Sequence, residues 1–173
     1  MKSWWKRRAD NPSEAMAKKA RLEKGDSILA VATDVVTGSI VVASAHELIV
    51  LAPDGSEFSR RRWLDVDAGS WENTTGTVSV TWVDGSRGTQ WTFGTDEMRF
   101  PEAFRDRVEA SRVIDAPVVD GDRDLGRAAV RKDLRTGELV PQLVLGRRVR
   151  RDDAVAHLIA EQTLAELTEQ VGL

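Results

Sequence analysis

The hydrophobic pattern of the chain changes at about residue 27, where a mostly polar beginning gives way to short apolar runs. Three runs rich in β-branched residues follow one another, at residues 27–33, 39–44 and 47–52. Runs of this length and composition, bounded by turn residues, are typical of β-strands. The next break is Asp54-Gly55, a pair favoured in tight hairpins because both residues tolerate positive φ. The pattern therefore predicts an antiparallel meander.

The clearest alternation of apolar and polar residues occurs at residues 77–93. Val78, Val80 and Trp82 point to one side of a strand in this register, and the threonine and serine residues between them point to the other. After a turn, Trp91 continues the pattern on a second strand. The segment predicts a half-buried antiparallel hairpin, with Trp82 and Trp91 as anchors of the core.

Three further strands are predicted near the C-terminus, at about residues 111–119, 125–134 and 137–146. Pro141 lies inside the last of them. Because proline cannot donate a ladder hydrogen bond, we expect this strand to lie at the edge of a sheet or to carry a bulge.

Helical patterns occur near both ends of the chain and once between strands. Start and stop signals predict a short helix over about residues 12–24, and Pro101 opens a second within residues 96–111. A third begins after an aspartate cap at residue 152 or 153 and ends at Gly172. Its apolar face comprises Ala156, Ile159, Ala160, Leu164, Leu167 and Val171. This amphipathic helix is expected to cover an apolar surface.

Together, these elements predict a mainly β fold. About nine short strands, one small intervening helix and a terminal helix describe a curved antiparallel sheet or barrel with a helical lid. At 173 residues the chain fits one ordinary domain. The expected organisation is a basic, aromatic N-terminal segment with a short helix at residues 1–24, followed by a single domain at residues 25–173.

The motifs "GDSILAVA", "WLDVDAGSW" and "FRDRVEASRV", with the closing helix, give the chain a family resemblance. It resembles a bacterial PH-like or GRAM-like domain and is similar to small PH-like proteins of high-GC Gram-positive bacteria. The resemblance implies the fold and a binding role, but no ligand. PH domains often bind phosphoinositides through basic residues in the first hairpin, whereas the corresponding turn here, residues 34–39, has no cation.

The net charge of −3 conceals an uneven distribution. Residues 1–24 hold eight cations and three anions, and the remainder holds 17 cations and 25 anions. A basic arm on an acidic body either meets an anionic partner or complements its own body. The absence of cysteine excludes disulfides and thiol catalysis and favours the cytoplasm. No apolar run reaches the roughly 18 residues of a spanning helix.

Candidate catalytic and metal-binding residues are few. His46 and His157 are the only histidines, and their spacing matches no metal motif. Ser44 and Ser111 lack the glycine pattern of a nucleophile elbow. The aspartates in "DGDRDLG" (120–126) resemble the start of a calcium loop, but the required glycine and final glutamate are missing. We therefore predict no enzyme activity, no metal and no cofactor.

Two clusters are predicted to bind a partner. The first comprises Trp4, Trp5, Lys6, Arg7 and Arg8, and the second comprises Arg147, Arg148, Arg150 and Arg151. Clustered arginines suit phosphate groups, although Asp152 and Asp153 offer local ion pairs that would absorb this charge. Indoles beside cations suit either a protein surface, including a second copy of the chain, or the headgroups of an anionic membrane. Nucleic acid is disfavoured by the acidic body.

Two functions remain open after these exclusions. The favoured hypothesis is a non-catalytic PH-like binding or scaffold module that docks to a protein or an anionic membrane surface, in the cytoplasm or at the inner face of the membrane. The alternative is a small ligand-binding protein or enzyme that uses a pocket in the β-sheet. An exposed groove over a filled core would favour the first, and polar groups converging in an apolar cavity would favour the second.

Overall fold

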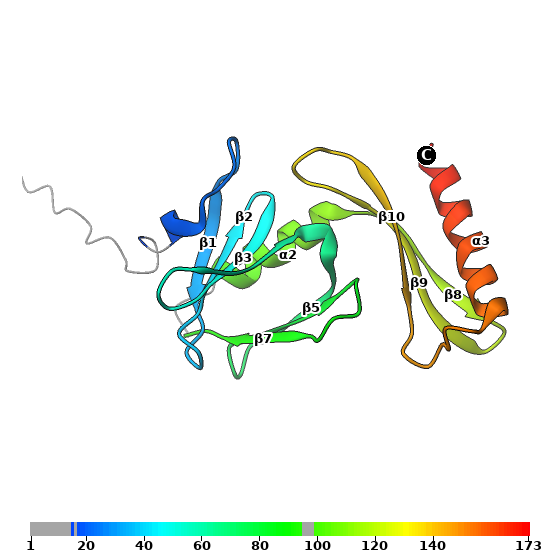
Figure 1. Cartoon of the computed structure of the whole chain (residues 1–173), viewed down its shortest axis with the longest axis horizontal. Helices are drawn as coiled ribbons and strands as arrows, with labels where there is room; N and C mark the ends of the chain where they lie inside the picture. Colours follow the sequence, from blue (N-terminus) through cyan, green and yellow to red (C-terminus); the bar gives the residue numbers. More distant parts are fainter. Residues whose placement is uncertain (1–14, 16, 95–98) are drawn as a thin grey trace, which may run out of the picture.

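The protein is a mainly β structure, and its described residues include three antiparallel sheets and the helices α2 and α3 (Figure 1). It is a computed structural model, and it describes residue 15 and residues 17–94 and 99–173. The mainly β class predicted from the sequence is confirmed.

The first sheet has the order β1-β2-β3-β4, and each strand pairs with the next along the chain. Its strands are β1 (Ile28–Thr33), β2 (Ile40–Ser44), β3 (Glu47–Leu51) and β4 (Glu57–Arg62). The second sheet, of order β5-β6-β7, follows a short 3₁₀ turn, η2 (Trp63–Asp65). Its strands are β5 (Val66–Glu72), β6 (Thr77–Trp82) and β7 (Thr89–Thr92). The predicted meander and the 77–93 hairpin are both present.

The main apolar core lies between these two sheets. Trp82 and Trp91 are 6% and 5% exposed, which confirms that the hairpin tryptophans anchor the core. Trp63 is fully buried, and its indole Nε1 donates to the carbonyl oxygen of Ser44 at 3.0 Å. A buried indole whose N–H has a hydrogen-bond acceptor is held in one orientation, so Trp63 is fixed within the core.

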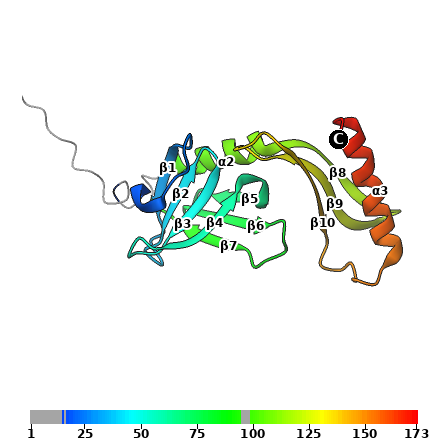
Figure 2. The same ribbon diagram turned by 45° about the horizontal axis from the view of Figure 1, so that its top comes forward.

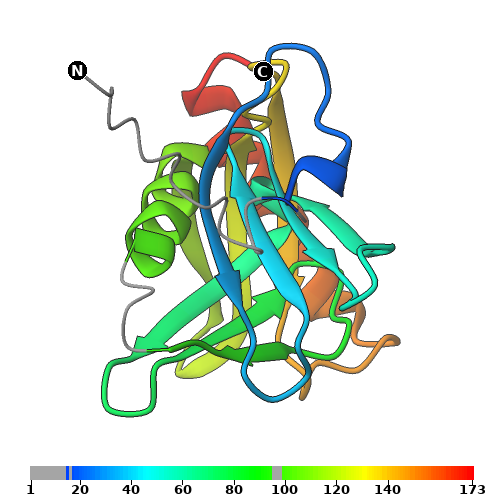
Figure 3. The same ribbon diagram turned by 90° about the vertical axis from the view of Figure 1, so that its left-hand side faces the viewer.

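Helix α2 (Arg99–Ser111) contacts strands of both sheets, chiefly β1, and also η2 and β5. Figure 3 shows the helix next to β1 and above the end of β5. It buries Phe100, Phe104 and Val108 against the core, so the helix predicted around Pro101 is confirmed for its described residues. Phe104 packs edge to face on Trp63, with ring centroids 5.7 Å apart.

The predicted helix over residues 12–24 is confirmed only in part: residues 15 and 17 are helical, and the segment ends earlier than predicted. η1 (Lys18–Ala20) is a 3₁₀ turn that ends at Arg21, whose φ of 49° is left-handed and cannot continue a helix. Ala17 and Ala20 are buried against the outer face of the first sheet, among Ile40, Val42, Ile49 and Leu51. Residues 12–14 and 16 lie outside the described residues.

The third sheet has the order β10-β9-β8, with β8 (Arg112–Asp120), β9 (Arg123–Lys132) and β10 (Leu139–Leu145). Helix α3 (Ala154–Gln170) covers one face of this sheet (Figures 1 and 2). Pro141 lies in the edge strand β10, as its missing donor requires. The carboxylate of Asp153 caps α3 by accepting from the Ala156 amide at 3.0 Å. The predicted terminal helix and its apolar face are therefore confirmed.

The barrel, which the sequence left as one possibility, is not formed by the described strands. β8, β9 and β10 pair with one another and not with β1–β7, so the described strands form three sheets and no closed barrel. α3 consequently covers the third sheet and its own apolar cluster, and it is not a lid on the first two sheets. Apolar periodicity shows that a helix must cover a surface but does not identify which one.

A polar contact connects the third sheet to the first two. Arg131 of β9 is 2% exposed and has four hydrogen bonds, to the Ser111 carbonyl (3.3 Å), the Ser111 hydroxyl (2.5 Å), Val66 O (3.0 Å) and Trp63 O (3.2 Å). Burial lowers the pKa of Arg131 to about 10. The guanidinium thus links β9 to α2, η2 and β5 without an ion pair to a described carboxylate.

Other polar contacts follow the same seam. Arg127 forms an ion pair with Asp67, and Gln142 Nε2 donates to Leu64 O at 2.9 Å. Arg62 forms an ion pair with Asp133 at 3.3 Å. These contacts hold the third sheet against η2 and β5 at several points.

Asp34 stabilises the turn between β1 and β2 and joins it to β7. Its carboxylate is 2% exposed and accepts from the Thr92 amide (2.9 Å) and from the Thr37 hydroxyl (2.6 Å), among other donors. Burial alone would raise the pKa of Asp34, but these donors and the backbone amides of Val36 and Thr37 hold the pKa below its usual value. The ionised carboxylate therefore stabilises the fold.

We expect Asp34→Asn to lower the free energy of unfolding by about 1–3 kcal/mol at pH 7, because bonds to an ionised acceptor are lost. A lowered folded-state pKa gives stability that is present above the unfolded value of about 3.9 and is lost as pH falls through the folded value. The difference between wild type and variant should therefore narrow below about pH 4. Urea denaturation at neutral and acidic pH measures this difference in free energy of unfolding. A difference that does not change with pH would contradict the role of the ionised Asp34.

Candidate binding groove

A groove lies between helix α2 and the edge of strand β5, with a cavity volume of about 300 Å³. We call it the α2–β5 groove. Its β5 wall is Gly69, Ser70 and Trp71, and its α2 wall is a helical stripe of Pro101, Glu102, Phe104, Arg105, Val108 and Glu109, with Arg112 after the helix. Val78 of β6 completes the lining.

The groove follows the edge of β5. Its lining includes three consecutive residues of the strand, 69–71, which alternate in direction, so it does not lie over one face of the sheet alone. Among the described strands β5 pairs only with β6, and of its backbone groups the carbonyls of Val66 and Asp67 also accept from Arg131 and Arg127. Alternate backbone N–H and C=O groups of an edge strand point away from its neighbour. This strand therefore presents backbone donors and acceptors beside an apolar depression.

Gly69 permits the close approach of the helix to the strand. A Cβ at this position would lie 2.4 Å from Cε1 of Phe104, too close for any side chain. Phe104 is itself held between Trp63 and Phe100, with ring centroids 5.7 and 6.4 Å away. The wall of the groove is thus rigid, and it is shaped before a ligand arrives.

The rim of the groove carries charges of both signs. Arg112 forms an ion pair with Glu109 at 3.2 Å. Among the residues that the structure describes, Arg105 and Glu102 have neither a hydrogen bond nor an ion pair. An apolar floor with exposed charged groups at its rim is the usual anatomy of a protein-binding surface.

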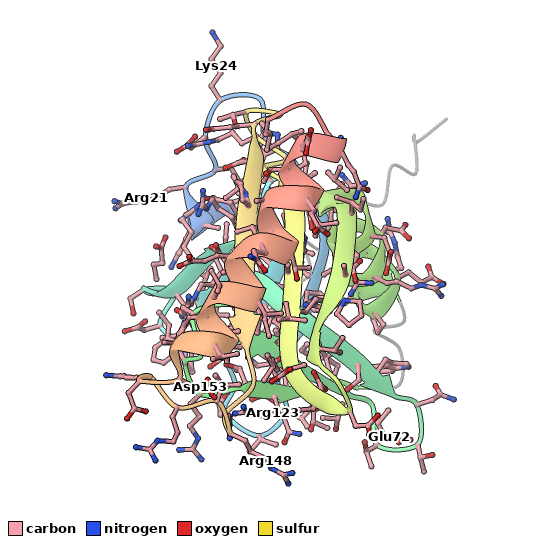
Figure 4. The ribbon with its side chains drawn as sticks, turned by 90° about the vertical axis from the view of Figure 1, so that its right-hand side faces the viewer. Arg21, Lys24, Glu72, Arg123, Arg148 and Asp153 are labelled. Atoms are coloured by element: carbon pink, nitrogen blue, oxygen red, sulfur yellow. The ribbon has the colours of Figure 1, made fainter. Side chains whose placement is uncertain are left out.

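Of the two clusters predicted to bind a partner, the structure describes only the second. Trp4, Trp5, Lys6, Arg7 and Arg8 lie outside the described residues. Arg147, Arg148, Arg150 and Arg151 lie in the loop between β10 and α3, all four exposed. Arg150 forms an ion pair with Asp152 at 2.8 Å, as the neighbouring aspartates suggested. The other three form no ion pair with any residue in the described ranges. In Figure 4, Arg148 extends from the same end of the third sheet as Arg123 and Asp153.

The candidate catalytic groups do not converge. His46 Nδ1 lies 3.8 Å from Asp26 in the bend after β2, whereas His157 lies in α3. Ser44 and Ser111 are both fully buried, and each hydroxyl donates to a backbone carbonyl. No group of three or more histidine, aspartate or glutamate side chains within the described part of the chain could hold a metal ion. The aspartates at 120–124 lie at the tight turn between β8 and β9.

The three-arginine run of β4 is divided among separate partners. Arg60 forms ion pairs with Glu47 (2.5 Å) and Glu57 (2.8 Å). Arg61 forms an ion pair with Asp84 at 2.7 Å and lies over the Trp82 ring. The hydrogen bond from Arg61 and others from Ser86 hold the pKa of Asp84 well below its usual value. These cations are therefore part of the fold and not of a common anion site.

The α2–β5 groove was not predicted from the sequence. Its walls come from segments about thirty residues apart, and no pattern within either segment indicates that the two lie side by side. Gly69, in an otherwise regular strand, was an available signal, since such a glycine often marks a close approach.

Comparison of the chain with protein-family models and with curated proteins gives no match. Among the helices in the described part of the chain, none combines the length and the apolar character needed to cross a bilayer.

Proposed function

We propose that this chain is a non-catalytic binding module that accepts an extended segment of a partner protein along β5, in the α2–β5 groove. The observation that carries the proposal is the coincidence of an unpaired strand edge with an apolar groove beside it. An extended segment gains main-chain hydrogen bonds from such an edge, and a neighbouring pocket selects its side chains.

The size of the groove supports the same function. A cavity of about 300 Å³ is large enough for one or two apolar side chains and is at the lower limit for a drug-sized ligand. Trp71 and Phe104 supply aromatic surface, which dominates the energy of many protein contacts. The preceding sheets form a filled core, so the groove is an external feature and not a cavity inside a sheet.

The PH-like assignment is part of this proposal. It is supported by the order of elements, in which seven strands in two antiparallel sheets precede an amphipathic helix, α2, that packs across both sheets. The cytoplasmic location expected from the absence of cysteine is also retained. Neither histidine lines the groove, and its polar residues are two arginines, two glutamates and a serine, which supports binding without catalysis.

Peptide selection tests the proposed function. A displayed library of random linear peptides is selected on the intact chain, and we expect the enriched peptides to bind Trp71→Ala at least about tenfold more weakly than wild type. Phe58→Ala is the matched control, because Phe58 is an exposed aromatic residue on β4, a different edge strand. Binding that survives Trp71→Ala in a folded variant would contradict the proposal.

Amide hydrogen exchange distinguishes strand addition from the alternative of a small-ligand pocket. Addition of a peptide to the edge should slow exchange at alternate residues of 68–72, because their free amides gain partners. A ligand that only fills the apolar depression would leave those amides unchanged. That result would favour the small-ligand function.

A further inference from the structure

Four exposed cations surround the point where the N-terminal segment meets the first sheet. They are Lys18, Lys19, Arg21 and Lys24, and we call them the N-terminal cationic surface. Within the described residues, none of the four forms a hydrogen bond or an ion pair. About half of the other arginines in the described ranges, such as Arg60, form ion pairs. The four cations therefore form a second exposed cationic surface, in addition to that of Arg147, Arg148 and Arg151 in the loop before α3.

The packing of this segment directs its charges outward. Ala17 and Ala20, 0% and 1% exposed, fix it to the outer face of the first sheet. The carbonyl oxygen of Ala20 also accepts from Arg60 Nη2 at 2.5 Å. Small buried residues allow the segment to lie flat on the sheet, and the long side chains between them extend into solvent. Figure 4 shows Arg21 and Lys24 projecting away from the body of the protein.

The anions near this surface are largely engaged elsewhere. Glu23 forms an ion pair with Arg135 at 2.7 Å, from the turn between β9 and β10. The Asp26 side chain is 1% exposed and accepts from the amides of Ser27 and His46. The Asp54 carboxylate accepts from the Ser56 amide, and the positive charge of Lys19 also helps to lower the pKa of Asp54. Neutral donors leave the charges of Asp26 and Asp54 in place, but within the described residues the four cations still outnumber these two anions.

We propose that the N-terminal cationic surface docks the protein on an anionic membrane. A lysine or arginine close to such a surface strengthens binding about fivefold, so four of them give a substantial attraction. This surface is separate from the α2–β5 groove.

A membrane is favoured over nucleic acid as the partner. The chain has a net charge of −3 and a pI of about 5.5, so a long polyanion that follows the protein surface would meet repulsion from the acidic body. A planar membrane touches only one face of the protein. Local charge at that face then decides the attraction, because the field of more distant charges is screened beyond about 8–10 Å at physiological salt.

The test is co-sedimentation of the full chain with phosphatidylcholine vesicles, with and without about a third phosphatidylserine. We expect binding only to the anionic vesicles and a loss of about 100-fold or more for the variant carrying Lys18→Gln, Lys19→Gln, Arg21→Gln and Lys24→Gln. The matched control removes equal charge from the loop before α3, through Arg147→Gln, Arg148→Gln, Arg150→Gln and Arg151→Gln. In Figure 4, Arg148 of this loop and Lys24 of the proposed surface lie at opposite ends of the view. The control should retain most of the binding.

Each other outcome overturns the proposal. Equal loss in both variants would indicate a response to net charge alone, and no loss in the first would exclude the N-terminal cationic surface. Binding to duplex DNA that matches binding to anionic vesicles, and that disappears in the first variant, would make nucleic acid the partner.

Two controls accompany the first variant. The four side chains are exposed and unpaired, so its thermal melts should coincide with those of wild type. Peptide binding to the α2–β5 groove should be unchanged in this variant.

Discussion

Replacing Arg131 with alanine is expected to lower the free energy of unfolding by about 2–4 kcal/mol. The guanidinium makes four hydrogen bonds, and a bond to a charged group contributes about 1.5–3 kcal/mol. Burial of the charge opposes this gain by several kcal/mol, and it also lowers the pKa of Arg131. The hydrogen bonds exceed that cost, and their loss removes the Arg131 donor from the carbonyl of Val66, whereas Trp63 O keeps the backbone amide of Val66 as a donor.

Equilibrium denaturation of the intact chain measures this effect. Lys132→Ala is the matched control, since Lys132 is an exposed cation on the same strand, and its removal should change stability by less than about 0.5 kcal/mol. Arg131→Lys should recover little, because one ammonium group cannot replace the planar fork of donors. If Arg131→Met were as stable as wild type, packing and not hydrogen bonding would hold the third sheet in place.

Replacing Leu167 with alanine should cost about 2–4 kcal/mol, as other buried large-to-small substitutions do. Leu167 is 4% exposed and lies in the apolar cluster between α3 and the third sheet. Leu158 in the same helix is 55% exposed, so the same substitution there should change stability by less than about 0.5 kcal/mol. Thermal or urea melts compare the two variants. Equal midpoints would show that α3 does not hold this sheet through its buried face.

These two substitutions also separate the two kinds of contact that organise the chain. Leu167 belongs to an apolar cluster confined to α3 and its sheet, whereas Arg131 connects that sheet to α2, η2 and β5. Arg131→Ala is therefore expected to weaken the contact with η2 and β5 first. Hydrogen exchange should report this as faster exchange along β9 before global unfolding.

The candidate site was less predictable than the fold. A groove is formed by the relative position of elements, and no local pattern encodes the distance between α2 and β5. Sequence reasoning selected clusters of charge because those are visible in one dimension. The run Arg60–Arg62 shows that cations adjacent in the sequence need not form one site, since its members form ion pairs with separate partners across the structure.

Lys18, Lys19, Arg21 and Lys24 show the opposite case. Their charge was evident in the sequence, but a helix over residues 12–24 would have distributed them around its circumference. The structure ends the helical turn at Arg21 and buries the intervening Ala20, which leaves the cations exposed on the outer side of the segment. Backbone conformation and alanine packing, not composition, created that surface.

The sequence by itself determined the local elements of this protein. Alternation of apolar and polar residues specified the strands, helical spacing in α2 and α3 specified the helices, and Asp-Gly pairs specified turns, because each depends on neighbours within a few residues. Only the tertiary structure decided that ten strands form three sheets, that α3 covers the last of them, and that an arginine joins them. Those outcomes depend on contacts between residues that are distant in the chain. The energies of such contacts are set by how the elements pack in three dimensions, and no local pattern contains them.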